Sequence, residues 1–149
     1  MRHGCELWEQ TVGIYCGAEY AALAAHSLMV AGHPNAAAEF VAAGERFQRA
    51  CEERTQAADL MRMRALLSID SLGPSQVEGL LRSAISLADA QGAALLQLRA
   101  ATDLADLLYT QGRAQEARLC LMPAMERLAE PETFQDVRRA RDLLTMLGA

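Results

Sequence analysis

The chain has 149 residues and a formal net charge of -5, with 52% hydrophobic and only 5% aromatic residues. This length suits a single domain with a sizeable core, and the acidic balance argues against binding to nucleic acid. Helix-forming Ala, Leu, Arg, Glu and Gln are abundant, whereas no alternating run of Val, Ile or Thr indicates a strand. The composition therefore predicts an all-α fold.

Hydrophobic periodicity predicts about eight helices, separated by turns that contain Gly or Pro. Their expected ranges in chain order are 4–14, 18–31, 35–53, 55–71, 75–90, 93–110, 114–129 and 133–147. Ser75 and Glu78 form an S-x-x-E pattern, which predicts a capping box at the start of the fifth helix. Pro123 lies inside the seventh helix and is expected to kink it, because proline removes a backbone hydrogen bond.

The positive charge comes from arginine alone, because the sequence contains no lysine. This usage fits either a GC-rich genome or a surface suited to bidentate contacts with carboxylates or phosphates. The run Arg138, Arg139 and Arg141 is interpreted as a solvated helix face in which Arg138 pairs with Asp142.

Cysteine usage and hydropathy indicate the compartment. The four cysteines are widely spaced, and we interpret them as buried free thiols in a reducing environment: Cys5, Cys16, Cys51 and Cys120. No apolar run approaches the roughly 20 residues that span a bilayer, and the first ten residues lack the apolar core of a signal peptide. We therefore expect a cytoplasmic protein with no membrane association, no metal and no cofactor.

Turn glycines point to an internal repeat. Gly32, Gly73 and Gly112 are spaced by about 40 residues, which is the range of helical repeats. Small apolar residues recur on both sides of the last turn, and they allow two antiparallel helices to approach closely. They are Ala101, Leu104, Ala105 and Leu108 before the turn, and Ala117, Leu121 and Ala124 after it.

This layout resembles the tetratricopeptide repeat. A closer resemblance is to the C-terminal repeat region of bacterial signalling proteins, namely cyclase–ATPase fusions and LuxR-type regulators, and its distinctive pieces are QGA, LRAATDLA and QGRAQEAR within residues 87–124. The resemblance implies a right-handed α-α superhelix with helix pairs at 17–53, 54–92 and 93–130. A half repeat at 1–16 and a capping helix at 131–149 complete this single domain. The chain has no cyclase or ATPase motif, so those activities are not expected.

The resemblance also implies two binding surfaces. In such repeats the first helix of each pair lines a concave groove, which here contains Glu19, His26, Met29, Asp59, Arg62, Arg99, Thr102, Asp106 and Tyr109. Arg62, Arg99 and Tyr109 suit an acidic or C-terminal segment, although Arg62 can equally pair with Asp59 or with a neighbouring helix.

The second surface is at the N-terminal end. An incomplete repeat leaves the apolar face formed by Leu7, Trp8 and Val12 without a neighbouring helix. We expect a second copy of the chain to cover this face and form a homodimer, and a partner protein is the next possibility.

No nucleotide-binding, hydrolase or metalloprotease motif occurs in the sequence. His26 has no convergent polar group at helical spacing, so we interpret it as a groove-lining or packed residue, and an enzyme that uses His26 with Asp59 or Asp106 is the weakest hypothesis. We expect a non-enzymatic protein–protein interaction or self-assembly module, in bacterial signalling or regulation. The alternative is a regulatory sensor that binds a small ligand or peptide in the concave groove.

Overall fold

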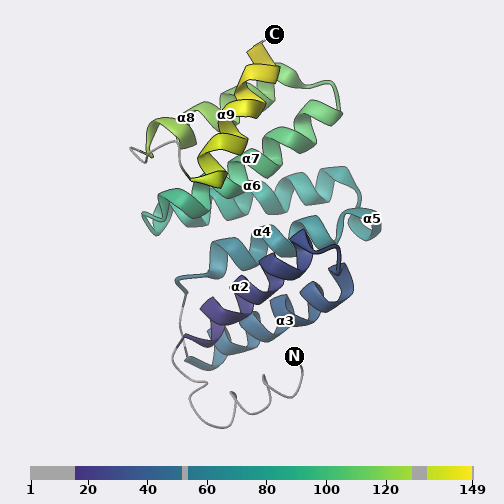
Figure 1. The fold of residues 1–149 in the computed structure, drawn as a ribbon, viewed down its shortest axis with the longest axis vertical. Helices are drawn as coiled ribbons and strands as arrows, with labels where there is room; N and C mark the ends of the chain where they lie inside the picture. Colours follow the sequence, from purple (N-terminus) through teal and green to yellow (C-terminus); the bar gives the residue numbers. More distant parts are fainter. Residues whose placement is uncertain (1–15, 52–53, 129–133, 149) are drawn as a thin grey trace. The chain divides into compact units, whose positions relative to one another are not determined.

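The computed structural model describes residues 16–51, 54–128 and 134–148 (Figure 1). These residues form eight helices, α2 to α9, and contain no strand, which confirms the all-α prediction. The chain divides into two compact units, with the boundary between Leu67 and Ser68. This boundary lies inside the predicted helix pair 54–92, so the two halves of that pair belong to different units. The predicted helix at 4–14 lies outside the described residues.

Unit 1 contains α2 (Gly17–Val30), α3 (Pro34–Cys51) and α4 (Ala57–Leu67). Each of these three helices packs against the other two. Half of their shared core is alanine, which allows close packing. The core residues are Ala18, Ala22, Ala25, Val41, Leu60 and Met63.

Gly44 on α3 marks a close approach of the three helices of unit 1. A Cβ atom on this residue would lie 2.9 Å from both δ carbons of Leu60 and 3.2 Å from the Cβ of Ala21. Leu60 belongs to α4 and Ala21 to α2. The absence of a side chain at position 44 therefore lets α3 approach both α2 and α4 closely at this position.

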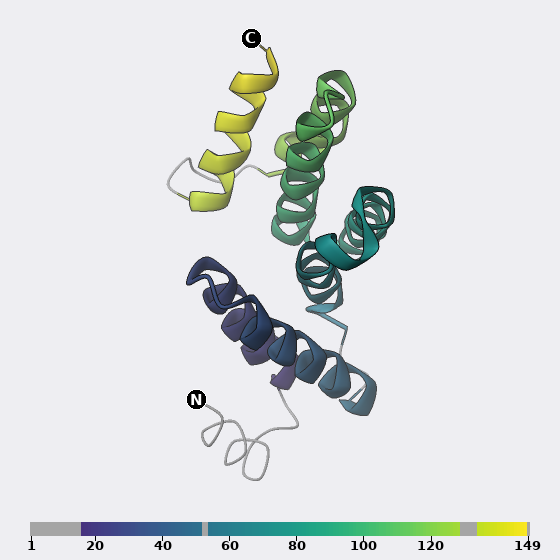
Figure 2. The ribbon, with the colours of Figure 1, turned by 90° about the vertical axis from the view of Figure 1, so that its right-hand side faces the viewer.

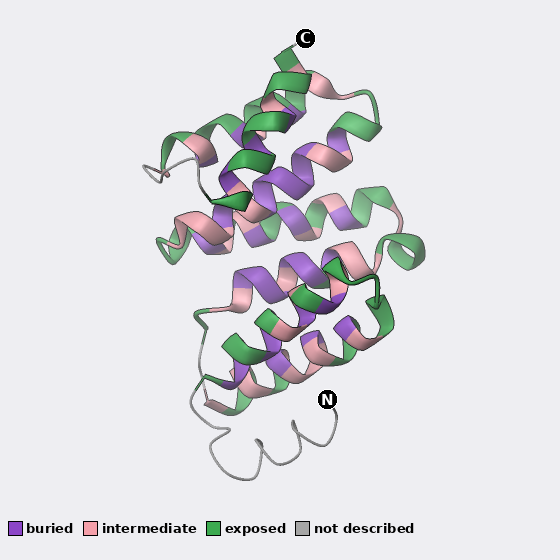
Figure 3. Cartoon of the chain, viewed as in Figure 1, coloured by how far each residue is buried: buried purple, intermediate pink, exposed green. Residues whose placement is uncertain are grey.

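Unit 2 contains α5 (Ile69–Leu72), α6 (Pro74–Ala90), α7 (Ala94–Thr110), α8 (Ala114–Glu126) and α9 (Gln135–Gly148). The central helix is α7, which packs against α6, α8 and α9, while α9 also packs against α8 (Figures 1 and 2). Nine of the 17 residues of α7 are buried, and most of this helix is coloured as buried in Figure 3. The core of unit 2 is therefore built around α7.

Two details of the predicted helices are wrong. The expected helix at 55–71 is interrupted at Ser68, which separates α4 from α5. The predicted capping box does not form, because α6 begins at Pro74 and has no side-chain cap. Proline suits the first helical position, where the N–H group would lack a partner anyway. The carboxylate of Glu78 is instead bonded to Arg82 and Arg113.

Three turns share one hydrogen-bond pattern, in which a glycine with positive φ follows the helix. These glycines are Gly32 (φ +75°), Gly92 (φ +66°) and Gly112 (φ +76°). In each turn the residue after the glycine donates its amide to the carbonyl five residues earlier, and the N···O distances are 2.8, 2.9 and 2.9 Å. The glycine itself donates to the carbonyl three residues earlier, which completes a Schellman motif.

Gly73 does not share this pattern. Its amide donates to Ile69, four residues earlier, and its ψ is 164°. The repeated turn is therefore found at Gly32, Gly92 and Gly112, rather than at the predicted set Gly32, Gly73 and Gly112.

Candidate functional site

The predicted groove residues of unit 1 differ in exposure. Glu19 is exposed, whereas His26 is half-buried and Met29 packs against the core. Asp59 and Arg62 are only 3% and 4% exposed, and Arg62 Nε donates to Asp59 Oδ1 at 2.7 Å. This pair confirms the second interpretation of Arg62, as the partner of Asp59.

The predicted groove residues of α7 lie next to α9. Arg99 Nε donates to Asp136 Oδ2 at 3.0 Å, and Asp106 accepts a 2.6 Å bond from Arg139. Thr102 is buried, and its hydroxyl donates to the carbonyl of Leu98 within α7. Arg99 and Asp106 therefore hold α9 against α7, while Tyr109, further along α7, is exposed.

Arg139 forms two of the polar contacts between α9 and α7. It donates to Asp106 and also to Asp103, whose carboxylate is 2.7 Å away and almost fully buried. Burial disfavours the charged form of Arg139, but the two carboxylates outweigh this effect and raise its pKa. Arg139 is therefore exposed, as the interpretation of a solvated face expects, but its ion pairs are with α7 rather than within its own helix.

Three large apolar side chains of α2 are exposed. Tyr20, Leu23 and Val30 are 58%, 63% and 77% exposed. Their spacing of three and seven residues places them on one side of the helix. The helix contains no arginine, and Glu19 is its one carboxylate.

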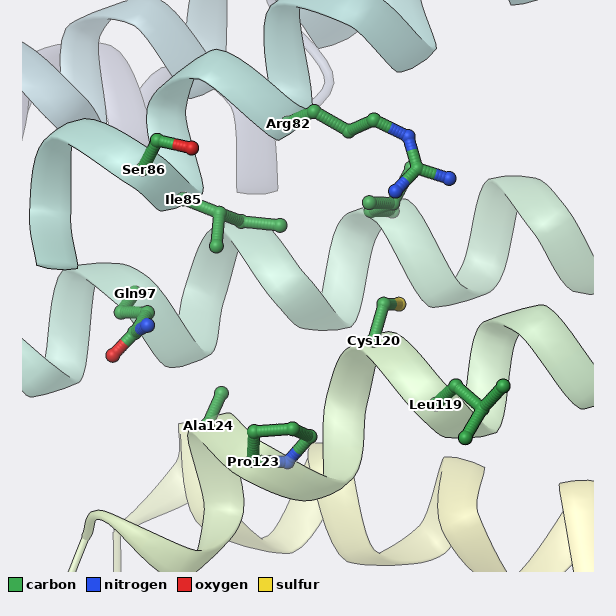
Figure 4. A pocket seen from close by; sticks show the side chains of 9 residues that line it. Arg82, Ile85, Ser86, Gln97, Leu119, Cys120, Pro123 and Ala124 are labelled. Carbon is green, nitrogen blue, oxygen red and sulfur yellow. The ribbon is translucent and has the colours of Figure 1, made fainter.

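A pocket of about 400 Å³ opens between α6 and α8, over α7 (Figure 4). Its apolar lining consists of Ile85, Leu104, Leu119, Pro123 and Ala124. Its polar lining consists of Arg82, Ser86, Gln97 and Cys120. Sequence reasoning missed this pocket, although it named four of the lining residues for other reasons: Leu104, Cys120, Pro123 and Ala124.

Ion pairs connect α6 and the α8 segment at both ends of these helices. Near their N-terminal ends, Arg113 Nη1 lies 2.6 Å from Glu78 Oε2. At their C-terminal ends, Arg127, which follows α8, pairs with Asp89 in the last turn of α6. Hydrogen bonds from Arg113 and then Arg82 lower the pKa of Glu78, so its carboxylate stays ionised at neutral pH. The two pairs fix the spacing of the helices that form the pocket walls.

Two carbonyl groups of pocket-lining residues lack a usual donor. Gln97 is 8% exposed; its Nε2 donates to Asp89 Oδ1 at 3.3 Å, but no donor among the described residues bonds its buried Oε1. Pro123 has no N–H group, so the carbonyl of Leu119 lacks the donor that position i+4 of a helix normally supplies.

Cys120 lines the same pocket as a protonated thiol. Burial raises its pKa to about 11, and Sγ lies 3.1 Å from the carbonyl oxygen of Ala117, to which it donates. Since the thiolate is the nucleophilic form of cysteine, Cys120 is a poor nucleophile at neutral pH. The pocket therefore offers apolar surface rather than a reactive group.

No family model matches the chain, and no curated protein or solved structure matches it. The resemblance to tetratricopeptide proteins therefore stays a prediction. In the part of the chain that the structure describes, no helix is long and apolar enough to cross a membrane, and no group of three or more His, Cys, Asp and Glu side chains is arranged to hold a metal ion. The predicted assembly residues Leu7, Trp8 and Val12 lie outside the described residues.

Proposed function

We propose that the chain is a non-enzymatic helical-repeat module of tetratricopeptide type that binds another protein chain through the exposed face of α2. The exposure of Tyr20, Leu23 and Val30 carries this proposal. Large exposed apolar side chains on one side of a helix favour an interaction site. As the sequence resemblance implies, bacterial signalling or regulation is the setting that we propose for it.

An internal comparison supports this use of α2. The helices α2, α3 and α4 pack pairwise in unit 1, as α7, α8 and α9 do in unit 2. Gly32 and Gly112 end α2 and α7 with the same turn, so Tyr20 corresponds in register to Ala100, which is buried. However, α7 has an additional neighbour, α6, for which the described residues of unit 1 offer no counterpart.

A second copy of the chain is the occupant that we propose. Because α2 contains a single carboxylate, Glu19, and no arginine, two copies can bring their α2 faces together with little charge repulsion. The same patch then serves both subunits, which is the arrangement of a two-fold dimer.

Solution mass tests this proposal, with two leucines as a matched pair. Leu23 on α2 and Leu119 on α8 are both 63% exposed. Light scattering across a concentration series should give a dimer for the wild type and for Leu119→Glu, and a monomer for Leu23→Glu. A wild-type monomer at every concentration would rule out self-assembly, and a dimer that survives Leu23→Glu would rule out this face.

The alternative of a sensor with its ligand in the predicted groove has less support. Arg99 and Asp106 contact α9, and Arg62 is buried beside Asp59. A ligand on that face of α7 would have to compete with α9. We therefore prefer the interaction module.

A further inference from the structure

We propose that two copies of the chain pair their α2 helices antiparallel, with Tyr20 of one copy against Val30 of the other and Leu23 against Ser27. This inference rests on the proposed self-assembly through α2. It adds the direction and the register of the contact, which the exposed side chains of α2 determine together.

The exposed side chains of α2 follow the spacing of a contact between two helices. Tyr20, Leu23, Ser27 and Val30 are all exposed, and the intervals between them are three, four and three residues. Intervals of this kind average 3.5 residues and keep one row of side chains facing a second helix along its length. The row therefore fits a helix that lies along α2.

The polar groups of α2 permit burial of this row. The hydroxyl of Ser27 already donates a 2.9 Å hydrogen bond to the carbonyl of Leu23 within the helix. A buried hydroxyl group is costly mainly when it lacks a hydrogen bond, so Ser27 can face a second helix at little cost. Glu19, the one carboxylate of α2, lies beside the row rather than in it.

Side-chain size decides the direction of the pair. In an antiparallel pair centred on Ala25, each layer joins a larger side chain to a smaller one, Tyr20 to Val30 and Leu23 to Ser27. A parallel pair would place Tyr20 on Tyr20 and Ser27 on Ser27, which crowds one layer and leaves a gap in another. Close packing favours layers of similar volume. The row is therefore its own complement when reversed, as a two-fold contact between identical chains requires.

Spin labels on Cys16 measure the direction. Cys16 is an exposed free cysteine at the start of α2, and the other cysteines are removed by Cys5→Ser, Cys51→Ser and Cys120→Ala. In the antiparallel register, position 16 of one copy lies level with position 34 of the other, so the labels are about 27 Å apart along the helix axis. A parallel pair would bring them within about 10 Å, the distance between packed helix axes. Pulsed electron paramagnetic resonance on the dimer should give the longer distance.

Disulfide trapping tests the register. In a chain without its own cysteines, Tyr20→Cys and Val30→Cys give two single-cysteine variants, one of which carries a tag. Oxidation of their mixture by glutathione disulfide should give the product that joins positions 20 and 30 at least about tenfold over either like pair. Like positions are about 15 Å apart along the axis, whereas a disulfide requires Cα atoms within about 7 Å. Leu119→Cys on α8 is the matched exposed control and should cross-link with neither variant.

The outcomes separate this register from the self-assembly on which it rests. A dimer whose labels lie within about 10 Å, or whose like positions cross-link better than mixed ones, would overturn the antiparallel register and leave α2 as the contact. A labelled protein that is monomeric by light scattering would overturn the self-assembly itself. Because the labelled protein keeps every side chain of the row, its result stands even if a cysteine at position 20 or 30 weakens the dimer.

Discussion

Arg113 and Glu78 connect the starts of two helices that are not neighbours in the sequence. The guanidinium of Arg113 donates two hydrogen bonds to Glu78, with Nη1 2.6 Å from Oε2 and Nη2 3.3 Å from Oε1. The backbone amide of Arg113 closes the Schellman turn after α7 by donating to Leu108 at 2.9 Å. A single residue thus fixes the end of α7, the start of α8 and the distance from α8 to α6.

The Glu78 link should weaken in acid. Its pKa is lowered from 4.5 in the folded chain by the bonds from Arg113 and Arg82. Glu78 therefore contributes stability that is present above about pH 4.5 and is lost as the pH falls through its lower folded pKa. Urea unfolding between neutral and strongly acidic pH should show a smaller acid-induced loss for Glu78→Gln than for the wild type. If the stability of Glu78→Gln and of the wild type changed in parallel with pH, the ion pairs of Glu78 would contribute nothing to folding.

The docking of α9 should depend on Arg139 much more than on Arg138. Arg139→Ala leaves the buried carboxylate of Asp103 without its bond from α9, so we expect a loss of about 2 kcal/mol in the free energy of unfolding. Arg138→Ala, at the next and exposed position, should change stability by less than about 0.5 kcal/mol. Chemical denaturation measures both, and equal effects would contradict the described contact of α9 with α7.

Replacement by alanine should lower the stability of the protein at Gly44 and raise it at Gly79. At Gly44 a new Cβ would overlap with Leu60 and Ala21. This overpacking should lower the free energy of unfolding by about 2 kcal/mol, which exceeds the gain of about 1 kcal/mol from the higher helix propensity of alanine. At Gly79 on α6 no atom lies within 4 Å of the added Cβ, so the gain of about 1 kcal/mol should be realised. Thermal melts of the two variants report these signs, and stabilisation by Gly44→Ala would show that α3 has room at this level.

Asparagine should distinguish the two kinds of turn glycine. Gly92 has the left-handed helical conformation that asparagine tolerates, so Gly92→Asn should cost no more than about 0.5 kcal/mol. Gly73 combines φ +78° with ψ 164°, a region that is essentially restricted to glycine, so Gly73→Asn should cost about 1–3 kcal/mol. If Gly92→Asn and Gly73→Asn lowered the denaturant midpoint equally, the two glycines would not differ in backbone conformation as described.

Much of the helical layout was predictable from the sequence, whereas the surfaces were not. Periodicity predicted the seven longer described helices. Glycine spacing, however, cannot distinguish the turn at Gly73 from that at Gly92, because both residues have positive φ and only their hydrogen bonds differ. Arg139 looked solvated because its partners Asp103 and Asp106 lie 36 and 33 positions away, beyond any helical pattern. The pocket was missed since it requires side chains from three helices.

The direct test of α2 as a contact surface is hydroxyl-radical footprinting of the full chain at several concentrations. Leu23 and Leu119 are equally exposed in the single chain, at 63%, so they serve as each other's reference. If two copies associate through α2, Leu23 should be protected at high concentration and become as reactive as Leu119 on dilution. Equal modification of the two leucines at every concentration would contradict the proposed role of this face.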